Sequence, residues 1–179
     1  MFCQTGSEYK RNKMVAYLPA RSFFMNHYHR QLLLAASPAA VYQAVATQHG
    51  LRSWWTQSCD VDTTVGGKAT FRFGEHHKVM QINSLEPGRE VRWHCVEALI
   101  NVDAFKRKDE WVGTDIVFRL TPQPGGKTLL DFEHIGLTPD FECFAVCERG
   151  WNQYLGSLQS LVETGQGAPF VPEVTSCSA

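Results

Sequence analysis

The stretch EWVGTDIVFRLTPQPGGKTLLDFEHIGL, residues 110–137, alternates apolar and polar side chains on both sides of a glycine-containing turn. Before the turn, Ile116, Phe118 and Leu120 alternate with Val117 and Arg119. After it, one set of alternate positions holds Thr128, Leu130, Phe132 and His134, and the other holds Leu129, Asp131 and Glu133. A period of two is typical of a strand with one dry face, and TPQPGGK suits a turn between antiparallel strands. The stretch therefore predicts a β-hairpin with a largely apolar inner face.

The same alternation extends toward the N-terminus. It appears in HYHRQLLLA (27–35), KATFRF (68–73), HKVMQINSLEPG (77–88) and REVRWHCVE (89–97). In the last of these, Val91, Trp93 and Cys95 share one face. Residues 59–135 therefore predict a run of antiparallel strands, preceded by one strand at 27–35.

Helical spacing appears on both flanks of this run. Ser37 is a good N-cap and Pro38 a good first residue for a short helix that ends near Thr47, and a second short helix carries the WW pair at 54–55. A long amphipathic helix is predicted from Thr138, its expected N-cap, to Gly165, its expected C-terminal stop. Strands in a run with segregated helices predict an α+β fold.

The chain has 179 residues, which favours one domain. Residues 1–24 have no clean period and are interpreted as a loose leader. Residues 25–167 form the predicted domain, and 168–179 a flexible tail.

Composition excludes several classes of protein. The formal net charge is -1, so the chain lacks the basic field that nucleic acid or an anionic membrane requires, and no apolar run is long enough to span a membrane. The six cysteines include no C-x-x-C pair, and no signal peptide is recognised at the N-terminus. We therefore expect reduced cysteines and a cytoplasmic location.

Several segments together resemble a known superfamily. They are LLLAASPAAVYQAVAT with LRSWW, GGKATFRF, the 110–137 hairpin, and the closing Trp151 with YLGSLQSLVETGQGAPF. Across residues 27–170 they are similar to the START-like helix-grip (SRPBCC) superfamily, which includes START lipid-transfer domains and birch-pollen-allergen proteins. The most similar branch is homologous to the C-terminal domain of the activator of heat-shock-protein-90 ATPase. This resemblance implies a curved antiparallel sheet, two short helices and a long C-terminal helix that enclose a cavity.

An aromatic inner face suits a small hydrophobic ligand in a pocket of roughly 300–1,000 Å³. A filled core is the alternative. Trp54 is expected to face the interior while Trp55 closes the rim, although both could simply attach the short helices to the sheet. The candidate ligand-binding residues are Trp54, Trp55, Phe71, Phe73, Trp93, Cys95, Phe118, Phe132, His134, Phe144, Cys147 and Trp151.

His134 shares a face with Phe132 and is either a satisfied core histidine or an acid–base group. Cys143 and Cys147 lie four residues apart on one helical face, but a fourth ligand for a structural metal is missing, so no metal site is predicted. PGGKT is not a phosphate-binding loop, because Thr121 stands where that motif needs glycine. Neither a catalytic motif nor a cofactor is predicted.

The leading hypothesis is a binding protein for a small hydrophobic or aromatic molecule. One alternative is an enzyme similar to polyketide cyclases or dehydratases, with His134, Tyr154 and His94 assisting proton transfer. Another is a co-chaperone acting on the heat-shock-protein-90 ATPase, against which the chain's short length counts. An exposed edge strand leaves a homodimer open.

Overall fold

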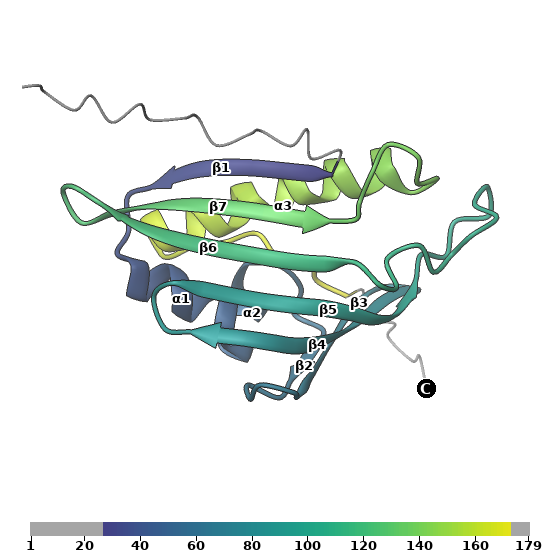
Figure 1. Cartoon of the computed structure of the whole chain (residues 1–179), viewed down its shortest axis with the longest axis horizontal. Coiled ribbons are helices and arrows are strands. Elements are labelled where there is room, and N and C mark those ends of the chain that lie inside the picture. Colours follow the sequence, from purple (N-terminus) through teal and green to yellow (C-terminus); the bar gives the residue numbers. More distant parts are fainter. Residues whose placement is uncertain (1–26, 173–179) are drawn as a thin grey trace, which may run out of the picture.

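The computed structural model describes residues 27–172, which form one seven-stranded sheet and three helices (Figure 1). Neighbouring strands are all antiparallel, in the order β1-β7-β6-β5-β4-β3-β2. The strands are β1 Tyr28–Leu34, β2 Cys59–Val61, β3 Lys68–Phe73, β4 His76–Glu86, β5 Glu90–Leu99, β6 Asp115–Gln123 and β7 Lys127–Ile135. The helices are α1 Pro38–Ala46, α2 Gln48–Trp54 and α3 Phe144–Thr164. The predicted α+β helix-grip fold is confirmed.

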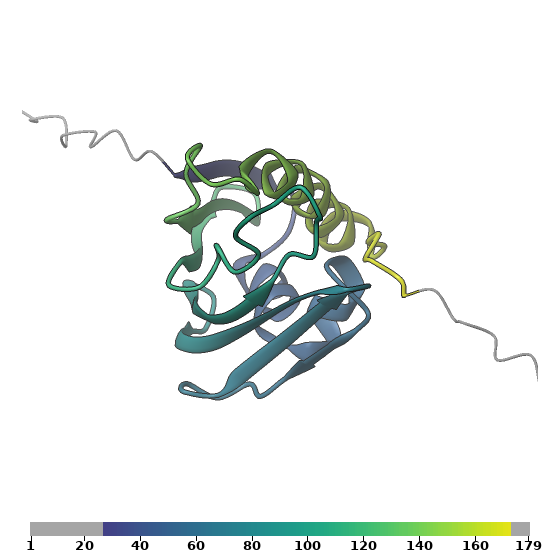
Figure 2. The same ribbon diagram turned by 90° about the vertical axis from the view of Figure 1, so that its right-hand side faces the viewer.

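The sheet is curved, and the three helices lie within its curve (Figure 2). Register shifts between β4 and β5, at Val79/Met80 and at Ile82/Ser84, are the kind of irregularity that bends a strand pair. In the predicted hairpin, Phe118 pairs with Phe132 and Ile116 pairs with His134, and all four side chains are buried. The alternation in the sequence therefore identified the inner face correctly.

The start of α3 differs from the prediction. The helix begins at Phe144, whereas residues 138–143 form successive turns, with Phe141 N bonded to Thr138 O. Glu110, from the connection between β5 and β6, accepts hydrogen bonds from the backbone N–H groups of Glu142 and Cys143. A carboxylate distant in sequence thus takes the capping role expected of Thr138. Gly165 ends the helix as predicted, in the left-handed conformation with φ 81°.

Part of the segment after Gly167, which was predicted as a tail, contacts the rest of the fold at Phe170. Phe170 N donates to Trp55 O, and Phe170 O accepts from Gln57 N, both at 2.9 Å. The Phe170 ring lies 5.7 Å from that of Phe73. These contacts attach the segment after α3 to the sheet. The predicted leader at 1–24 lies outside the described residues.

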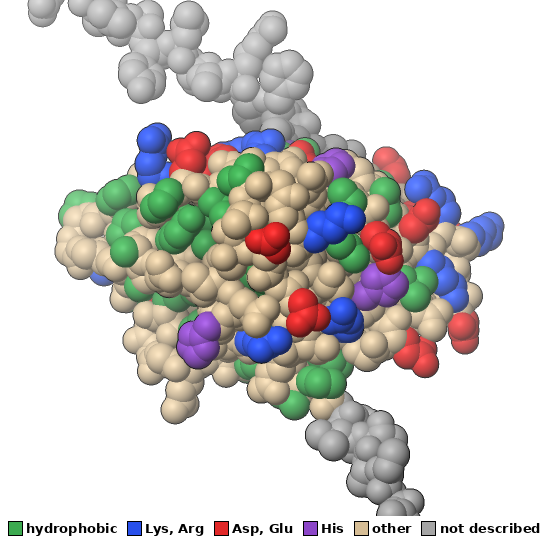
Figure 3. All heavy atoms as spheres, turned by 90° about the horizontal axis from the view of Figure 1, so that it is seen from below, with side chains coloured by type: hydrophobic (Ala, Val, Ile, Leu, Met, Phe, Trp, Pro, Cys, Tyr) green, Lys and Arg blue, Asp and Glu red, His purple; other side chains and the backbone are tan. Residues whose placement is uncertain are grey.

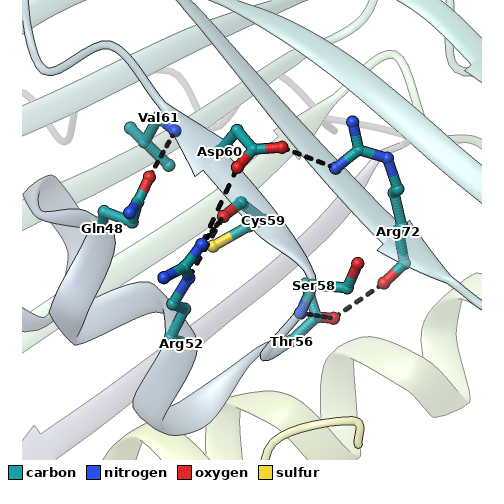
Figure 4. A network of polar contacts seen from close by, with 8 residues as sticks. All are labelled: Gln48, Arg52, Thr56, Ser58, Cys59, Asp60, Val61 and Arg72. Atoms are coloured by element: carbon teal, nitrogen blue, oxygen red, sulfur yellow. Dashed lines mark hydrogen bonds and ion pairs between the residues drawn. The ribbon is translucent and has the colours of Figure 1, made fainter. Parts of the chain in front are cut away.

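A polar network joins α2 to β2 and β3 (Figure 4). Arg52 donates from Nε and Nη2 to Cys59 O, at 3.1 and 2.7 Å. Thr56 Oγ1 donates to Arg72 O at 2.7 Å, and Val61 N donates to Gln48 Oε1 at 2.9 Å. The network fixes the end of α2, where the two adjacent tryptophans lie.

Candidate functional site

Trp54 and Trp55 are both buried, with exposed fractions of 0% and 2%. Trp54 donates from Nε1 to Ala44 O at 2.9 Å, which holds α2 against α1. The two indoles stack with centroids 5.7 Å apart. The expectation that Trp55 closes an exposed rim is therefore wrong, because Trp55 points into the domain.

Trp55 is the centre of an aromatic cluster that fills the middle of the concave face. Its ring centroid lies 4.2 Å from that of Phe71, 5.3 Å from Trp151 and 5.9 Å from Trp93. Most of the predicted ligand-binding residues lie in this packed interior and do not border the pocket: Trp54, Phe71, Trp93, Cys95, Phe118, Phe132 and His134. Phe144 is half-buried against the core and also does not border the pocket. Burial raises the pKa of the Cys95 thiol to about 12, so this thiol is unreactive near neutral pH.

A pocket of about 200 Å³ remains at one end of the concave face. Its walls come from β3 and β4, from the β5–β6 connection and from the first half of α3. The lining residues are Trp55, Phe73, His76, Lys78, Ile100, Val102, Trp111, Val146, Cys147, Gly150, Trp151 and Tyr154. Four of them, Trp55, Phe73, Cys147 and Trp151, are among the sequence candidates. The pocket is smaller than the predicted range because aromatic side chains occupy the rest of the interior.

The β5–β6 connection lies beside the start of α3 (Figure 2). Carboxylates hold the two segments together. Glu142 Oε2 accepts hydrogen bonds from the backbone nitrogens of Lys106 and Arg107, at 2.7 and 3.0 Å. In the opposite direction, buried Glu110 accepts from the backbone of Glu142 and Cys143 at 3.1 and 2.9 Å. This reciprocal arrangement positions Trp111 as a wall of the pocket.

His134 lies behind Trp111, fully buried and fully hydrogen-bonded. Trp151 Nε1 donates to His134 Nδ1 at 3.0 Å, so the neutral ring carries its proton on Nε2 and donates it to Thr114 Oγ1 at 2.9 Å. Thr114 in turn donates to Trp111 O. Burial, with smaller contributions from the charges of Lys78 and His27, lowers the pKa of His134 to about 3. The satisfied core histidine is therefore the correct alternative.

The other two proposed proton-transfer groups are separated in space. The His94 side chain is not part of the buried core, and its Nδ1 lies 2.7 Å from Asp115 Oδ1. Its sequence neighbours Trp93 and Cys95 are buried. Tyr154 does line the pocket, against Phe73. Burial raises the pKa of its hydroxyl, which therefore stays protonated at neutral pH. The three groups do not converge on one point.

Lys78 is a lining residue that the sequence analysis missed. Its side chain is buried, with an exposed fraction of 9%, and its Nζ lies 4.9 Å from the ring centroids of both Phe73 and Trp111. Burial lowers the pKa of Lys78, and the nearby thiols of Cys147, Cys95 and Cys143 partly offset this effect. The signal was present, because Lys78 is in phase with the inward-facing Met80 and Ile82.

Cys147 borders the pocket on the opposite wall. Its Sγ accepts a hydrogen bond from Trp111 Nε1 at 3.1 Å. Hydrogen bonding from the Cys143 thiol is the main cause that lowers the pKa of Cys147, against the opposing effect of burial. Cys59, Cys95, Cys143 and Cys147 all have free thiols.

Acidic and basic side chains are interspersed on the face shown in Figure 3. Within residues 27–172, no three His, Cys, Asp or Glu side chains are arranged to hold a metal ion. No helix in that part of the chain is long and apolar enough to cross a membrane.

Comparison with known proteins identifies a matching family and similar solved structures. The model of the family described as Activator of Hsp90 ATPase homolog 1-like protein matches residues 35–163. The sequence has no match among curated proteins. The solution structure of the Aha1 dimer from Colwellia psychrerythraea is similar with a TM-score of 0.65 and 28% identity, over 79% of this chain and 98% of that one.

Two further solved structures are also similar. Protein CV1439 from Chromobacterium violaceum has a TM-score of 0.57 and 26% identity, over 77% of this chain and 97% of that one. CalU16 from Micromonospora echinospora has a TM-score of 0.57 and 18% identity, over 78% of this chain and 75% of that one. The last likeness concerns the fold alone.

Proposed function

The chain belongs to the family of Activator of Hsp90 ATPase homolog 1-like proteins, and we propose that it is a binding protein that holds a small apolar or aromatic molecule in the pocket beside α3. One observation carries the proposal: a hollow of about 200 Å³ remains within an otherwise filled interior, and its walls include Trp55, Trp111 and Trp151. Ligand pockets are typically concave and mostly apolar, and this pocket is lined chiefly by aromatic and aliphatic side chains.

The size and lining of the pocket limit the ligand. An engineered apolar cavity of about 150 Å³ stays dry and binds benzene. A pocket of about 200 Å³ suits a single aromatic ring with a short substituent, or a small fused pair of rings. The indoles of Trp111 and Trp151, stacked at 5.8 Å, offer flat surfaces to such a ring.

Binding without chemistry is favoured over the enzyme alternative. The pair of nitrogens on His134 is already used by Trp151 and Thr114, and His94 lies away from the pocket. Of the three groups proposed for proton transfer, Tyr154 is the one that lines the pocket, so no two of them form an acid–base pair there. The free thiols of the described cysteines support a reducing location, and we extend the proposal to the cytoplasm.

Two glycines of α3 allow a matched test. A Cβ added at either Gly150 or Gly156 would meet no atom within 4 Å, but only Gly150 lines the pocket. Gly150→Leu should therefore fill the pocket, whereas Gly156→Leu makes the same change of residue elsewhere on the same helix.

The probes are indole and naphthalene, and binding is measured by native mass spectrometry and by the increase of Tm. We expect wild type and Gly156→Leu to bind at least one probe, and Gly150→Leu to lose about tenfold or more in affinity. The proposal is refuted if neither probe binds wild type, or if both variants bind as wild type does.

A second candidate is the co-chaperone role, acting through the surface. It is favoured by the 28% identity to the Aha1 dimer, 98% of which is matched. Stimulation of ATP hydrolysis by a heat-shock-protein-90 chaperone would support this role, and a homodimer on size-exclusion chromatography with light scattering would support a similar assembly. Unchanged hydrolysis and a monomeric mass would argue against both.

A further inference from the structure

The two walls of the pocket differ in polarity. The α3 wall consists of Val146, Cys147, Gly150 and Trp151, and Tyr154 continues it. The strand wall carries His76 and Lys78, which are two residues apart on β4 and therefore share a face. These two nitrogen-bearing side chains lie on one wall only, which suits a ligand that is itself polar at one end.

The Lys78 side chain is buried beside the pocket and has no anionic partner in the described part of the chain. None of the ion pairs or side-chain hydrogen bonds among residues 27–172 involves its ammonium group. The rings of Phe73 and Trp111, each at 4.9 Å, are the contacts that the structure provides. Cation–π contacts recover only part of the hydration that a buried ammonium loses.

Cys147 does not remove this deficit. Its sulfur already accepts a hydrogen bond from Trp111 Nε1, and no hydrogen bond within the described residues joins it to the Lys78 side chain. Lys78 can donate three hydrogen bonds. The ammonium group is therefore able to engage an oxygen supplied from outside the chain.

His76 adds a second donor on the same wall. Its Nδ1 accepts a hydrogen bond from Asn101 N at 2.8 Å, so the neutral ring carries its proton on Nε2. Burial is the main cause that lowers the pKa of His76, which favours this neutral form at neutral pH. One cation and one neutral donor suit a carboxylate better than a phosphate dianion, which binds where several donors converge.

We propose that the occupant of the pocket is an amphipathic carboxylic acid, whose carboxylate pairs with Lys78 and whose aromatic or aliphatic body packs against Trp55, Trp111 and Trp151. The inference rests on the proposed binding function and specifies the chemical class of its ligand. A carboxylate at Lys78 offsets the buried charge, and burial strengthens the attraction between the two ions. A neutral molecule of equal shape leaves the ammonium group unpaired.

The test compares 3-phenylpropionate with 3-phenylpropanamide, which have the same body and differ in charge. Titration calorimetry measures both on wild type, on Lys78→Met and on Lys68→Met. Methionine keeps an unbranched chain of similar length, and Lys68 is an exposed lysine on β3, so Lys68→Met controls for net charge. Near-UV circular dichroism checks that each variant is folded.

We expect wild type and Lys68→Met to bind the acid about tenfold more tightly than the amide, and Lys78→Met to lose this preference. Equal affinity for acid and amide on wild type overturns the inference even if Lys78→Met fails to fold. An acid preference that survives in folded Lys78→Met also overturns it. If indole or naphthalene binds but the acid does not, the acid class is wrong and the binding function stands. If no probe binds, both are wrong.

Discussion

The two ends of the concave face are built differently. Toward α1 and α2 the space is filled by side chains from regular helices and strands, among them Leu34, Val41, Val91, Leu120, Leu130, Leu155 and Leu158. Toward the start of α3 the space is partly hollow, and its walls include Ile100, Val102 and Trp111 from the irregular β5–β6 connection. The first end stabilises the fold, while the second keeps an unfilled site whose shape depends on a connection that can vary without altering the sheet.

The end of the concave face next to the start of α3, the hollow end, also holds three polar side chains whose burial reduces stability unless they are hydrogen-bonded. Lys78, Glu110 and His134 are all buried there. Glu110 and His134 are fully hydrogen-bonded, whereas the ammonium group of Lys78 lies against the rings of Phe73 and Trp111 and makes no hydrogen bond within the described residues. A buried group without a partner reduces stability, so its presence beside a pocket is more readily explained by a ligand than by folding.

The largest expected effect compares one tryptophan from each region. Trp93→Ala removes a fully enclosed indole that packs against Phe71 and Phe118, so we expect a loss of about 3–5 kcal/mol in the free energy of unfolding. Trp111→Ala should cost about half as much, because one side of that indole already borders a hollow. Urea denaturation measures both losses. Equal losses would mean that the two ends are equally well packed.

The next effect concerns the pH dependence of the hollow end. The folded pKa of His134 is about 3, below the ordinary value of 6.5, so the unfolded chain binds the additional proton between these values. The contribution of neutral His134 to the free energy of unfolding is fully present above pH 6.5. It is lost as the pH falls toward 3, by about 1.4 kcal/mol per pH unit. Between pH 6.5 and 4, wild type should lose about 3 kcal/mol more than His134→Gln.

Denaturation at several pH values measures this difference, and an NMR titration follows the His134 ring directly. A ring that titrates near pH 6.5 in the folded protein would show that water reaches it, and the hollow end would then be open rather than sealed behind Trp111.

The sequence predicted the filled part of the concave face better than the hollow end. The alternation around Phe118 and Phe132 identified the inner face, because a period of two is a local property of a strand. The start of α3 was missed, because its cap is Glu110, a contact made only after folding. Lys78 was in phase with Met80, but a lysine facing inward contradicts the usual preference, and the alternation alone did not outweigh it.

A smaller effect tests the attachment of the connection. Glu110→Gln replaces one accepting oxygen with an amide NH₂ that faces a backbone N–H donor, so we expect a loss of about 1–3 kcal/mol. Hydrogen exchange should rise in residues 100–114 and at the start of α3, but not near α1. Asp109→Asn is the control, since Asp109 is exposed and its ion pair with Arg107 is 4.0 Å long. Faster exchange throughout the sheet would show that the two ends are not independent.

The smallest effect concerns the network that holds the tryptophan pair between the two ends. Arg52→Ala removes both hydrogen bonds to Cys59 O and should cost about 1 kcal/mol. Arg89→Ala is the matched control, because Arg89 is 81% exposed and its ion pair with Glu86 spans 3.9 Å, so the expected cost is about 0.5 kcal/mol or less. Thermal unfolding measures both variants, and indole binding is measured in parallel.

Arg52 lies on the outer side of α2, while Trp55 reaches the pocket from the end of the same helix. If Arg52→Ala reduces the free energy of indole binding by more than it reduces the free energy of unfolding, the network positions Trp55 for the ligand. The filled end then contributes directly to the site. If binding is unchanged, the aromatic cluster alone holds Trp55 in place, since its contacts with Phe71, Trp93 and Trp151 surround the ring. The pocket then depends on the connection and α3, as the division between the two ends requires.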